Sequence, residues 1–171
     1  MTTTAQAVRA VNHQFNIRNA GLFAGHLKSA DLIQKSQGQA LDLPEKDIVK
    51  IVLATMIGFA TTKNPNLVDD YYNLKSPSGS KLGESVEHFI ANPADLFEIS
   101  ISNATPAAQI IYRGPDRPME TELFTGPEIA IPGFSRTTGI TGDCWQRLSR
   151  ALRFPDTSFK SRRRRRHRTY K

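Results

Sequence analysis

The chain has 171 residues, of which 39% are apolar and 23% are charged. This size and composition are typical of one soluble domain with a short extension. The longest apolar stretch, residues 48–60, is interrupted by Lys50 and Thr55 and is much shorter than the roughly 18 to 20 residues of a membrane span. We therefore expect no membrane-spanning helix.

The chain carries no sign of a secretory signal, because its first residues lack a charged region followed by an apolar one. We accordingly expect a protein that works inside a cell. The single cysteine, Cys144, excludes an intrachain disulfide, and the four histidines are scattered without the spacing of zinc ligands. The sequence predicts no metal site.

Charge is unevenly distributed along the chain. Residues 1–142 contain 12 Lys and Arg against 14 Asp and Glu, whereas residues 143–171 contain 11 Lys and Arg against 2 Asp. A nearly neutral body that ends in a strongly basic segment is typical of a folded module that binds a polyanion.

The first 43 residues are predicted to be helical with interruptions. Apolar residues such as Val8, Val11 and Phe15 recur at intervals of three and four, while Gly21 and Gly25 disfavour one long helix. A helix from about residue 44 to 62 follows.

The apolar residues of the 44–62 helix cover most of its circumference, so it must be covered on more than one side. It is either a central core helix of a single chain, or part of a helical hairpin that pairs with a second copy across a two-fold axis. In the second interpretation the homodimer interface contains Ile48, Val52, Met56, Ile57 and Phe59.

Three further segments follow in chain order. Residues 67–74 read as a shorter returning helix, and residues 83–90 resume helical spacing. Residues 97–102 alternate strictly between apolar and polar side chains, which leaves strand and helix equally open. Proline and glycine are frequent from residue 106 to 142, which predicts extended chain, and residues 144–152 predict one more short helix.

The arginine run near the C-terminus is the strongest functional signal. Consecutive guanidinium groups repel one another unless a polyanion neutralises them, and arginine grips phosphate oxygens with two parallel hydrogen bonds. We expect RNA or another nucleic acid to be bound, largely independently of its sequence, by the following residues: Arg147, Arg150, Arg153, Lys160, Arg162, Arg163, Arg164, Arg165, Arg166, Arg168 and Lys171.

Two alternatives accompany this interpretation. A basic run also acts as a nuclear-localisation signal, in which case nuclear import receptors are partners. Trp145 and Tyr170 are candidates for stacking on unpaired bases, although packing of Trp145 against the body is the more ordinary role.

An enzyme is not expected: the nearest approach to a catalytic pair is Glu84 with His88, and neither a catalytic residue nor a cofactor is predicted.

Three segments in shared order resemble the core (capsid) proteins of hepadnaviruses, including those of the non-enveloped nackednaviruses of fish. Residues 112–123 read YRGPDRPMETEL, which is similar to the family's Tyr-Arg-x-Pro-x-x-Pro segment. Residues 83–90, GESVEHFI, resemble the start of the helix that precedes that segment, and residues 67–73, LVDDYYN, resemble part of the second hairpin helix.

The resemblance implies an all-α fold with a helical hairpin assembly domain (1–124), a Gly/Pro-rich linker (125–142) and a disordered basic tail (143–171). It implies a core protein that dimerises, closes into an icosahedral shell, packages RNA and occurs in virions and in the host cell. Tyr112, Arg113, Pro115 and Pro118 would then make contacts between dimers, with ordinary core packing as the alternative for Tyr112. The rival is a host nucleic-acid-binding protein, ribosomal or chromatin-associated, that forms no shell.

Overall fold

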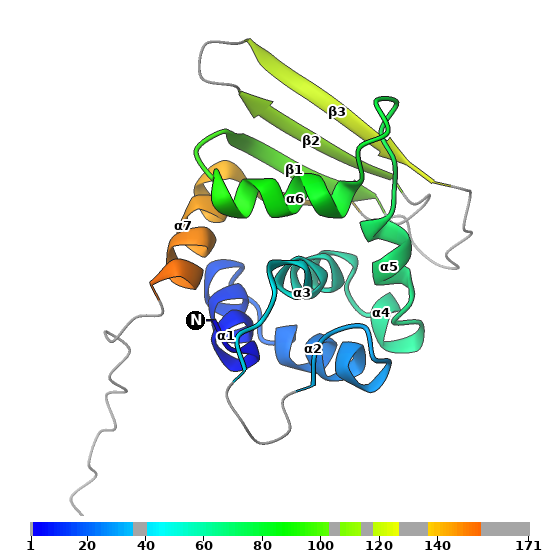
Figure 1. Ribbon diagram of the computed structural model, residues 1–171, viewed down its shortest axis with the longest axis vertical. Helices are drawn as coiled ribbons and strands as arrows, with labels where there is room; N and C mark the ends of the chain where they lie inside the picture. Colours follow the sequence, from blue (N-terminus) through cyan, green and yellow to red (C-terminus); the bar gives the residue numbers. More distant parts are fainter. Residues whose placement is uncertain (1, 36–40, 103–106, 114–117, 127–136, 155–171) are drawn as a thin grey trace, which may run out of the picture.

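The computed structural model describes residues 2–35, 41–102, 107–113, 118–126 and 137–154. Within these ranges the chain forms seven helices and one four-stranded antiparallel sheet (Figure 1). The prediction of an all-α fold is therefore wrong, and the description of the protein as helical holds for only one of its two layers. The fold is mixed α and β.

The elements follow one another in a simple order. The helices that precede the sheet are α1 (Thr4–Gln14), α2 (Ala20–Ser29), α3 (Glu45–Ile57), α4 (Ala60–Lys63), α5 (Leu67–Tyr72) and α6 (Leu82–Ala91). The strands are β1 (Leu96–Ser102), β2 (Ala107–Arg113), β3 (Met119–Thr125) and β4 (Thr137–Thr141), and α7 (Gly142–Arg153) follows.

Helix α3 is the centre of the helical layer. Ten of its 13 residues are buried, and α1, α2, α5 and α6 of the same chain pack around it (Figure 1). The helix ends at Gly58, whose φ of 81° and ψ of −146° suit glycine alone, so the helix expected over 44–62 is divided into α3 and α4. The apolar circumference of α3 is thus satisfied within one chain.

The sheet has the strand order β3-β2-β1-β4. Ile99 of β1 pairs with Ile110 of β2 on one side and with Ile140 of β4 on the other, and all three side chains are buried. Because side chains alternate between the faces of a strand, this row marks the face that lies against the helices. The strand interpretation of residues 97–102 is confirmed.

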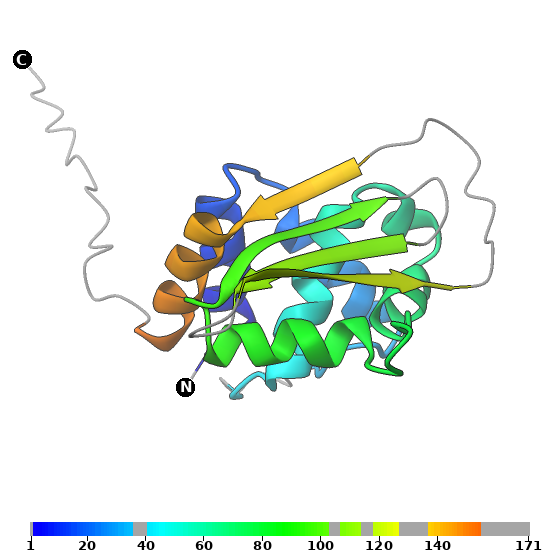
Figure 2. The same cartoon turned by 90° about the horizontal axis from the view of Figure 1, so that it is seen from above.

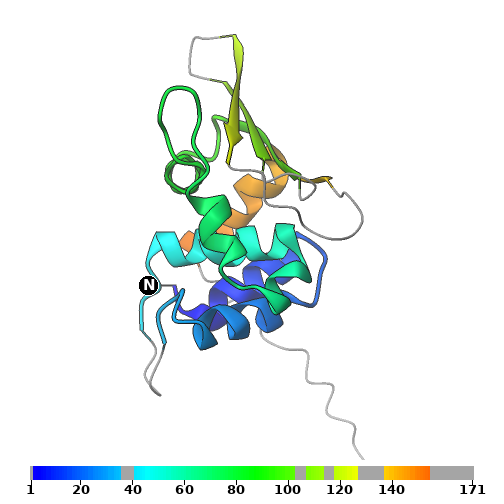
Figure 3. The same ribbon diagram turned by 90° about the vertical axis from the view of Figure 1, so that its right-hand side faces the viewer.

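The two layers are stacked, with the sheet at one end of the molecule and most of the helices at the other (Figure 3). Figure 2 looks onto the sheet, where the strands lie side by side in the order β4, β1, β2, β3. Helix α7 packs on α1, α6, β1 and β4, and so joins the layers. No helix in the described ranges is both long and apolar enough to cross a bilayer.

Helix α7 begins where the chain leaves β4, in close contact with β1. A Cβ atom at Gly142 would lie 2.2 Å from the main-chain oxygen of Leu96, so only glycine permits this approach. The segment expected to be a linker over 125–142 thus includes a strand of the sheet, and the start of the expected basic tail is a helix packed on the body. Residues 127–136 and 155–171 lie outside the described residues.

Candidate nucleic-acid interface

Helix α7 has one buried side and one exposed side. Trp145, Leu148 and Leu152 are buried, with at most 4% of each residue exposed. Arg147 and Arg150 lie on the exposed side. The spacing of these residues follows the helical repeat, so a single amphipathic helix both packs on the body and presents cations to solvent.

Two hydrogen bonds fix α7 to the end of α6. The indole Nε1 of Trp145 donates to the main-chain oxygen of Phe89 at 2.8 Å, and the Ser149 hydroxyl donates to the main-chain oxygen of Ile90 at 2.6 Å. Both acceptors belong to the last turn of α6, where carbonyl groups have no partner within their own helix. The orientation of α7 is therefore determined by polar contacts as well as by apolar packing.

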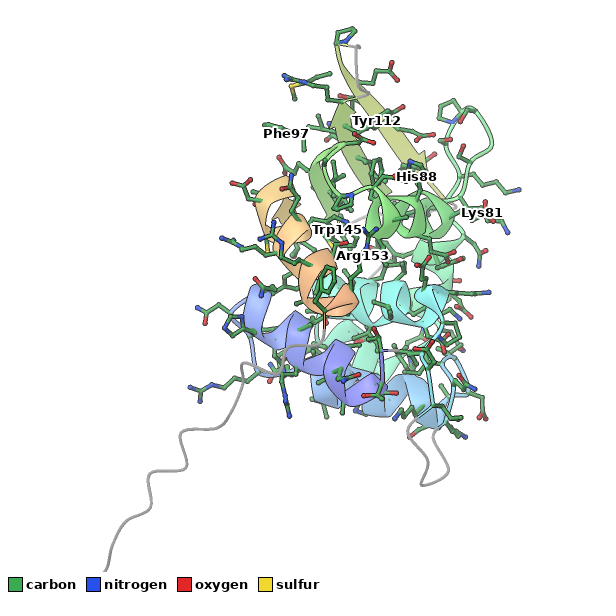
Figure 4. All side chains as sticks on the ribbon, turned by 60° about the vertical axis from the view of Figure 1, so that its left-hand side comes forward. Lys81, His88, Phe97, Tyr112, Trp145 and Arg153 are labelled. Atoms are coloured by element: carbon green, nitrogen blue, oxygen red, sulfur yellow. The ribbon has the colours of Figure 1, made fainter. Side chains whose placement is uncertain are left out.

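Arg153 also contributes to this anchor. Its Nη2 donates to the main-chain oxygen of Ile90 at 3.0 Å and makes a shorter hydrogen bond to that of Ala91. A cation at the C-terminal end of a helix interacts favourably with the helix dipole. Figure 4 shows Arg153 and Trp145 on the α7 side of this junction. Part of the Arg153 guanidinium is thus engaged with the main-chain oxygens at the end of α6.

Helix α1 lies antiparallel to α7. At one end the Thr2 hydroxyl donates to the main-chain oxygen of Leu152 at 2.8 Å, and at the other the Cys144 thiol donates to that of Gln14 at 3.2 Å. Because both ends are in contact, the two helices pack against each other.

The N-terminal segment adds further cations to this pair. Arg9 in α1 and Arg18 in the turn after it are exposed, and residues 2–30 contain no Asp or Glu. We use the term arginine surface for the exposed arginines of α1, α7 and this turn: Arg9, Arg18, Arg147, Arg150 and Arg153. Asp143, in the first turn of α7, is the acidic residue of that helix.

The ion pairs formed among the described residues include no residue of the arginine surface. They are Lys35 with Asp31, Lys50 with Asp69 and Lys81 with Glu84. No arginine in the described ranges takes part in one. Exposed cations that no described acidic residue neutralises favour binding of an anionic ligand.

Arg147 also acts on the one thiol of the chain. Burial raises the pKa of Cys144, and the hydrogen bond and charge of Arg147 act in the opposite direction. The thiol is therefore held mostly protonated at neutral pH, and its ionisation reports on the charge at Arg147.

Three of the residues predicted to bind nucleic acid are thus placed together on α7, namely Arg147, Arg150 and Arg153. The remaining eight lie outside the described residues: Lys160, Arg162, Arg163, Arg164, Arg165, Arg166, Arg168 and Lys171. Arg9 and Arg18 were not predicted. The signal that points to them is the absence of acidic residues from the first 30 positions, which a charge balance taken over residues 1–142 conceals.

The residues proposed for a dimer interface do not form one surface. Four of them, Ile48, Val52, Met56 and Ile57, are buried in the core of their own chain with at most 4% exposed. Phe59 differs, because 63% of it is exposed and its ring contacts that of Phe23 edge to face. Helix α3 therefore needs no second subunit to cover its apolar circumference.

Three of the residues proposed for contacts between dimers, Tyr112, Arg113 and Pro118, lie at one end of the β2–β3 pair. The Tyr112 hydroxyl donates to Glu120 at 2.9 Å, and the Tyr112 ring lies 5.8 Å from that of Phe89, centroid to centroid. Arg113 and Pro118 are exposed, and Pro115 lies outside the described residues. Tyr112 is thus packed against its own chain.

The remaining chemistry of the described residues is limited. The Glu84 carboxylate lies 3.6 Å from the Lys81 ammonium, and the His88 ring packs edge to face on Phe89. Trp145 is fully buried, as its packing alternative predicts. No group of three or more His, Cys, Asp or Glu side chains within the described ranges could hold a metal ion.

Comparison of the chain with protein families, curated proteins and solved structures finds no match. The resemblance to hepadnavirus core proteins therefore rests on the residue patterns alone, and the mixed α and β fold departs from the all-α fold that it implies.

Proposed function

We propose that the protein binds nucleic acid through its phosphates, with the arginine surface and the arginine-rich C-terminal segment acting as one site. The observation that carries this proposal is the position of α7. The helix presents Arg147 and Arg150 to solvent, and the chain that follows it, residues 155–171, contains eight Lys and Arg and one Asp.

The chemistry of the site favours contacts to the backbone over contacts to base edges. Guanidinium groups form paired hydrogen bonds with phosphate oxygens, and these contacts carry no sequence information. Neutralising phosphates releases condensed counterions, which makes binding strongly dependent on salt. We expect high affinity at low salt and little sequence preference.

The proposal keeps what the core-protein and host-protein interpretations share, which is a basic segment that holds nucleic acid. It omits the hairpin dimer and the icosahedral shell. The resemblance implies both for an all-α chain whose hairpin helix pairs with a second copy, whereas this fold is mixed α and β and α3 is enclosed by its own chain.

The test is a fluorescence-anisotropy titration of the full chain with two unrelated single-stranded oligonucleotides at several salt concentrations. The logarithm of the binding constant should fall with the logarithm of salt concentration with a slope of about −5 to −8, since single strands contribute about −0.7 per neutralised phosphate. Both oligonucleotides should give the same slope. A binding constant that does not change with salt would contradict the proposal.

A matched pair of variants tests the contribution of the folded surface. Replacing Arg9, Arg147 and Arg150 by Gln should make the slope less steep by about 2. The control replaces an equal number of exposed cations from other parts of the molecule, namely Lys63, Lys75 and Arg113. The control should retain the slope of the unmodified chain, and equal losses in the two variants would show that the arginine surface has no special role.

A further inference from the structure

An aromatic side chain stands in solvent beside the arginine surface. Phe154 directly follows α7, and 72% of it is exposed, the highest fraction among the exposed large apolar residues of the described ranges. Its main-chain N–H donates to the main-chain oxygen of Arg150 at 2.9 Å, which holds the residue at the end of the helix. Most of the Phe154 ring is therefore in contact with solvent and is not part of the buried core.

Helical spacing places position 154 on the side of α7 that carries the cations. It is four residues after Arg150 and seven after Arg147, and both separations return to the same side of a helix. The buried side is occupied by Trp145, Leu148 and Leu152. Position 154, at the C-terminal end of α7, therefore lies on the side that presents Arg147 and Arg150, and neither arginine forms an ion pair with a described acidic residue.

On the basis of the proposed function, we infer that Phe154 stacks on an unpaired base and that the ligand is single-stranded nucleic acid. A ring beside cations satisfies two requirements of single-strand binding, since the arginines hold the backbone while the ring covers a base. In a duplex the faces of the bases are covered by neighbouring bases, so Phe154 would contribute little to duplex binding. Trp145, the aromatic residue that the sequence suggested for stacking in α7, is fully buried and cannot do so.

A membrane surface is the other partner that combines basic and aromatic residues. Helices that lie in a membrane interface insert a continuous apolar face. The apolar face of α7 is buried against the body, which leaves one phenylalanine, so the geometry favours the single strand.

The experiment compares the full chain with its Phe154→Ala variant on fluorescein-labelled 20-nucleotide oligo(dT) and on a duplex of 20 base pairs. Phe154→Ala should weaken binding to oligo(dT) by about 5- to 150-fold, the range for loss of one aromatic stack, without changing the salt slope. Affinity for the duplex should stay the same. Phe154→Trp should retain binding, and the new indole should be quenched by oligo(dT).

The matched control is Phe97→Ala, which removes a 55% exposed phenylalanine from β1. It should bind oligo(dT) like the unmodified chain. Unchanged binding of Phe154→Ala to oligo(dT), or an equal loss on the duplex, would overturn the stacking role while leaving the proposed function intact. Binding to phosphatidylserine vesicles is measured in parallel. If Phe154→Ala weakens binding to these vesicles alone, the ring would be assigned to a membrane instead. If the unmodified chain binds neither nucleic acid, the proposed function itself fails.

Discussion

The indole of Trp145 and the main-chain oxygen of Phe89 are joined by a 2.8 Å hydrogen bond, although the two residues are 56 positions apart in the chain. Trp145 is fully buried, and Phe89 belongs to the last turn of α6. The contact ties the helix that carries the arginines to the helix that flanks the sheet. The stability of the fold and the presentation of the basic site are consequently coupled.

Replacing Trp145 should destabilise the protein in two measurable steps. Trp145→Phe leaves the Phe89 oxygen without its donor and should lower the free energy of unfolding by about 1 to 3 kcal/mol. Trp145→Ala also creates a cavity and should cost about 3 to 5 kcal/mol. Urea denaturation followed by circular dichroism measures both. An unchanged midpoint for Trp145→Ala would contradict the burial of this side chain.

Two glycines in helices should respond to alanine in opposite directions. A Cβ atom at Gly83 would lie 2.2 Å from the buried Tyr72 ring, so Gly83→Ala should destabilise by about 1 to 3 kcal/mol. Gly25 has no atom within 4 Å of that position, and Gly25→Ala should stabilise by about 0.5 to 1 kcal/mol because alanine favours helix. Thermal unfolding compares the two variants, and the same direction of change in both would contradict the packing around Gly83.

Tyr71 should make the fold sensitive to alkali. Burial raises its pKa from 10.0 to about 12, and its hydroxyl donates to the main-chain oxygen of Ser102 at 2.7 Å. The folded state thus favours the protonated phenol, so this stabilisation is complete below pH 10 and is lost as the pH rises toward 12.

The check is urea denaturation at a series of pH values from 8 upward. Tyr71→Phe should be less stable at pH 8, because the Ser102 oxygen loses its donor, and its stability should fall less steeply above pH 10. An identical alkaline decline in the two proteins would contradict the role assigned to Tyr71.

The Cys144 thiol should report on charge at the arginine surface. Burial raises its pKa and Arg147 lowers it, so Arg147→Gln should raise the pKa further and slow the reaction with a thiol reagent at pH 8. Arg150→Gln, on the same exposed side of α7, is the control and should have the smaller effect. Oligo(dT) that neutralises Arg147 should likewise slow the reaction of Cys144 in the unmodified protein. Equal reaction rates for Arg147→Gln and Arg150→Gln would contradict the contact between Arg147 and Cys144.

Sequence patterns within a few residues of one another were sufficient for some features. The apolar spacing of residues 83–90 predicted α6, and the alternation over 97–102 allowed the strand β1 as one of two alternatives. Because apolar residues cover most of the circumference of the 44–62 segment, other elements must pack against several of its sides. The pattern does not distinguish elements of the same chain from those of a second copy. The pairing of β2 with β3 escaped prediction because proline and glycine in the intervening segments indicated extended chain without showing a partner.

The sequence by itself determined the segregation of charge, the amphipathic character of α7 and the position of several helices, because each depends on residues close together in the chain. Only the tertiary structure decided that α3 is enclosed by one chain and that α1 lies against α7. The contact between Thr2 and Leu152 joins positions 150 residues apart. Packing of distant segments, not local periodicity, brings Arg9 and Arg147 onto adjacent helices, and composition alone cannot specify which segments pack together.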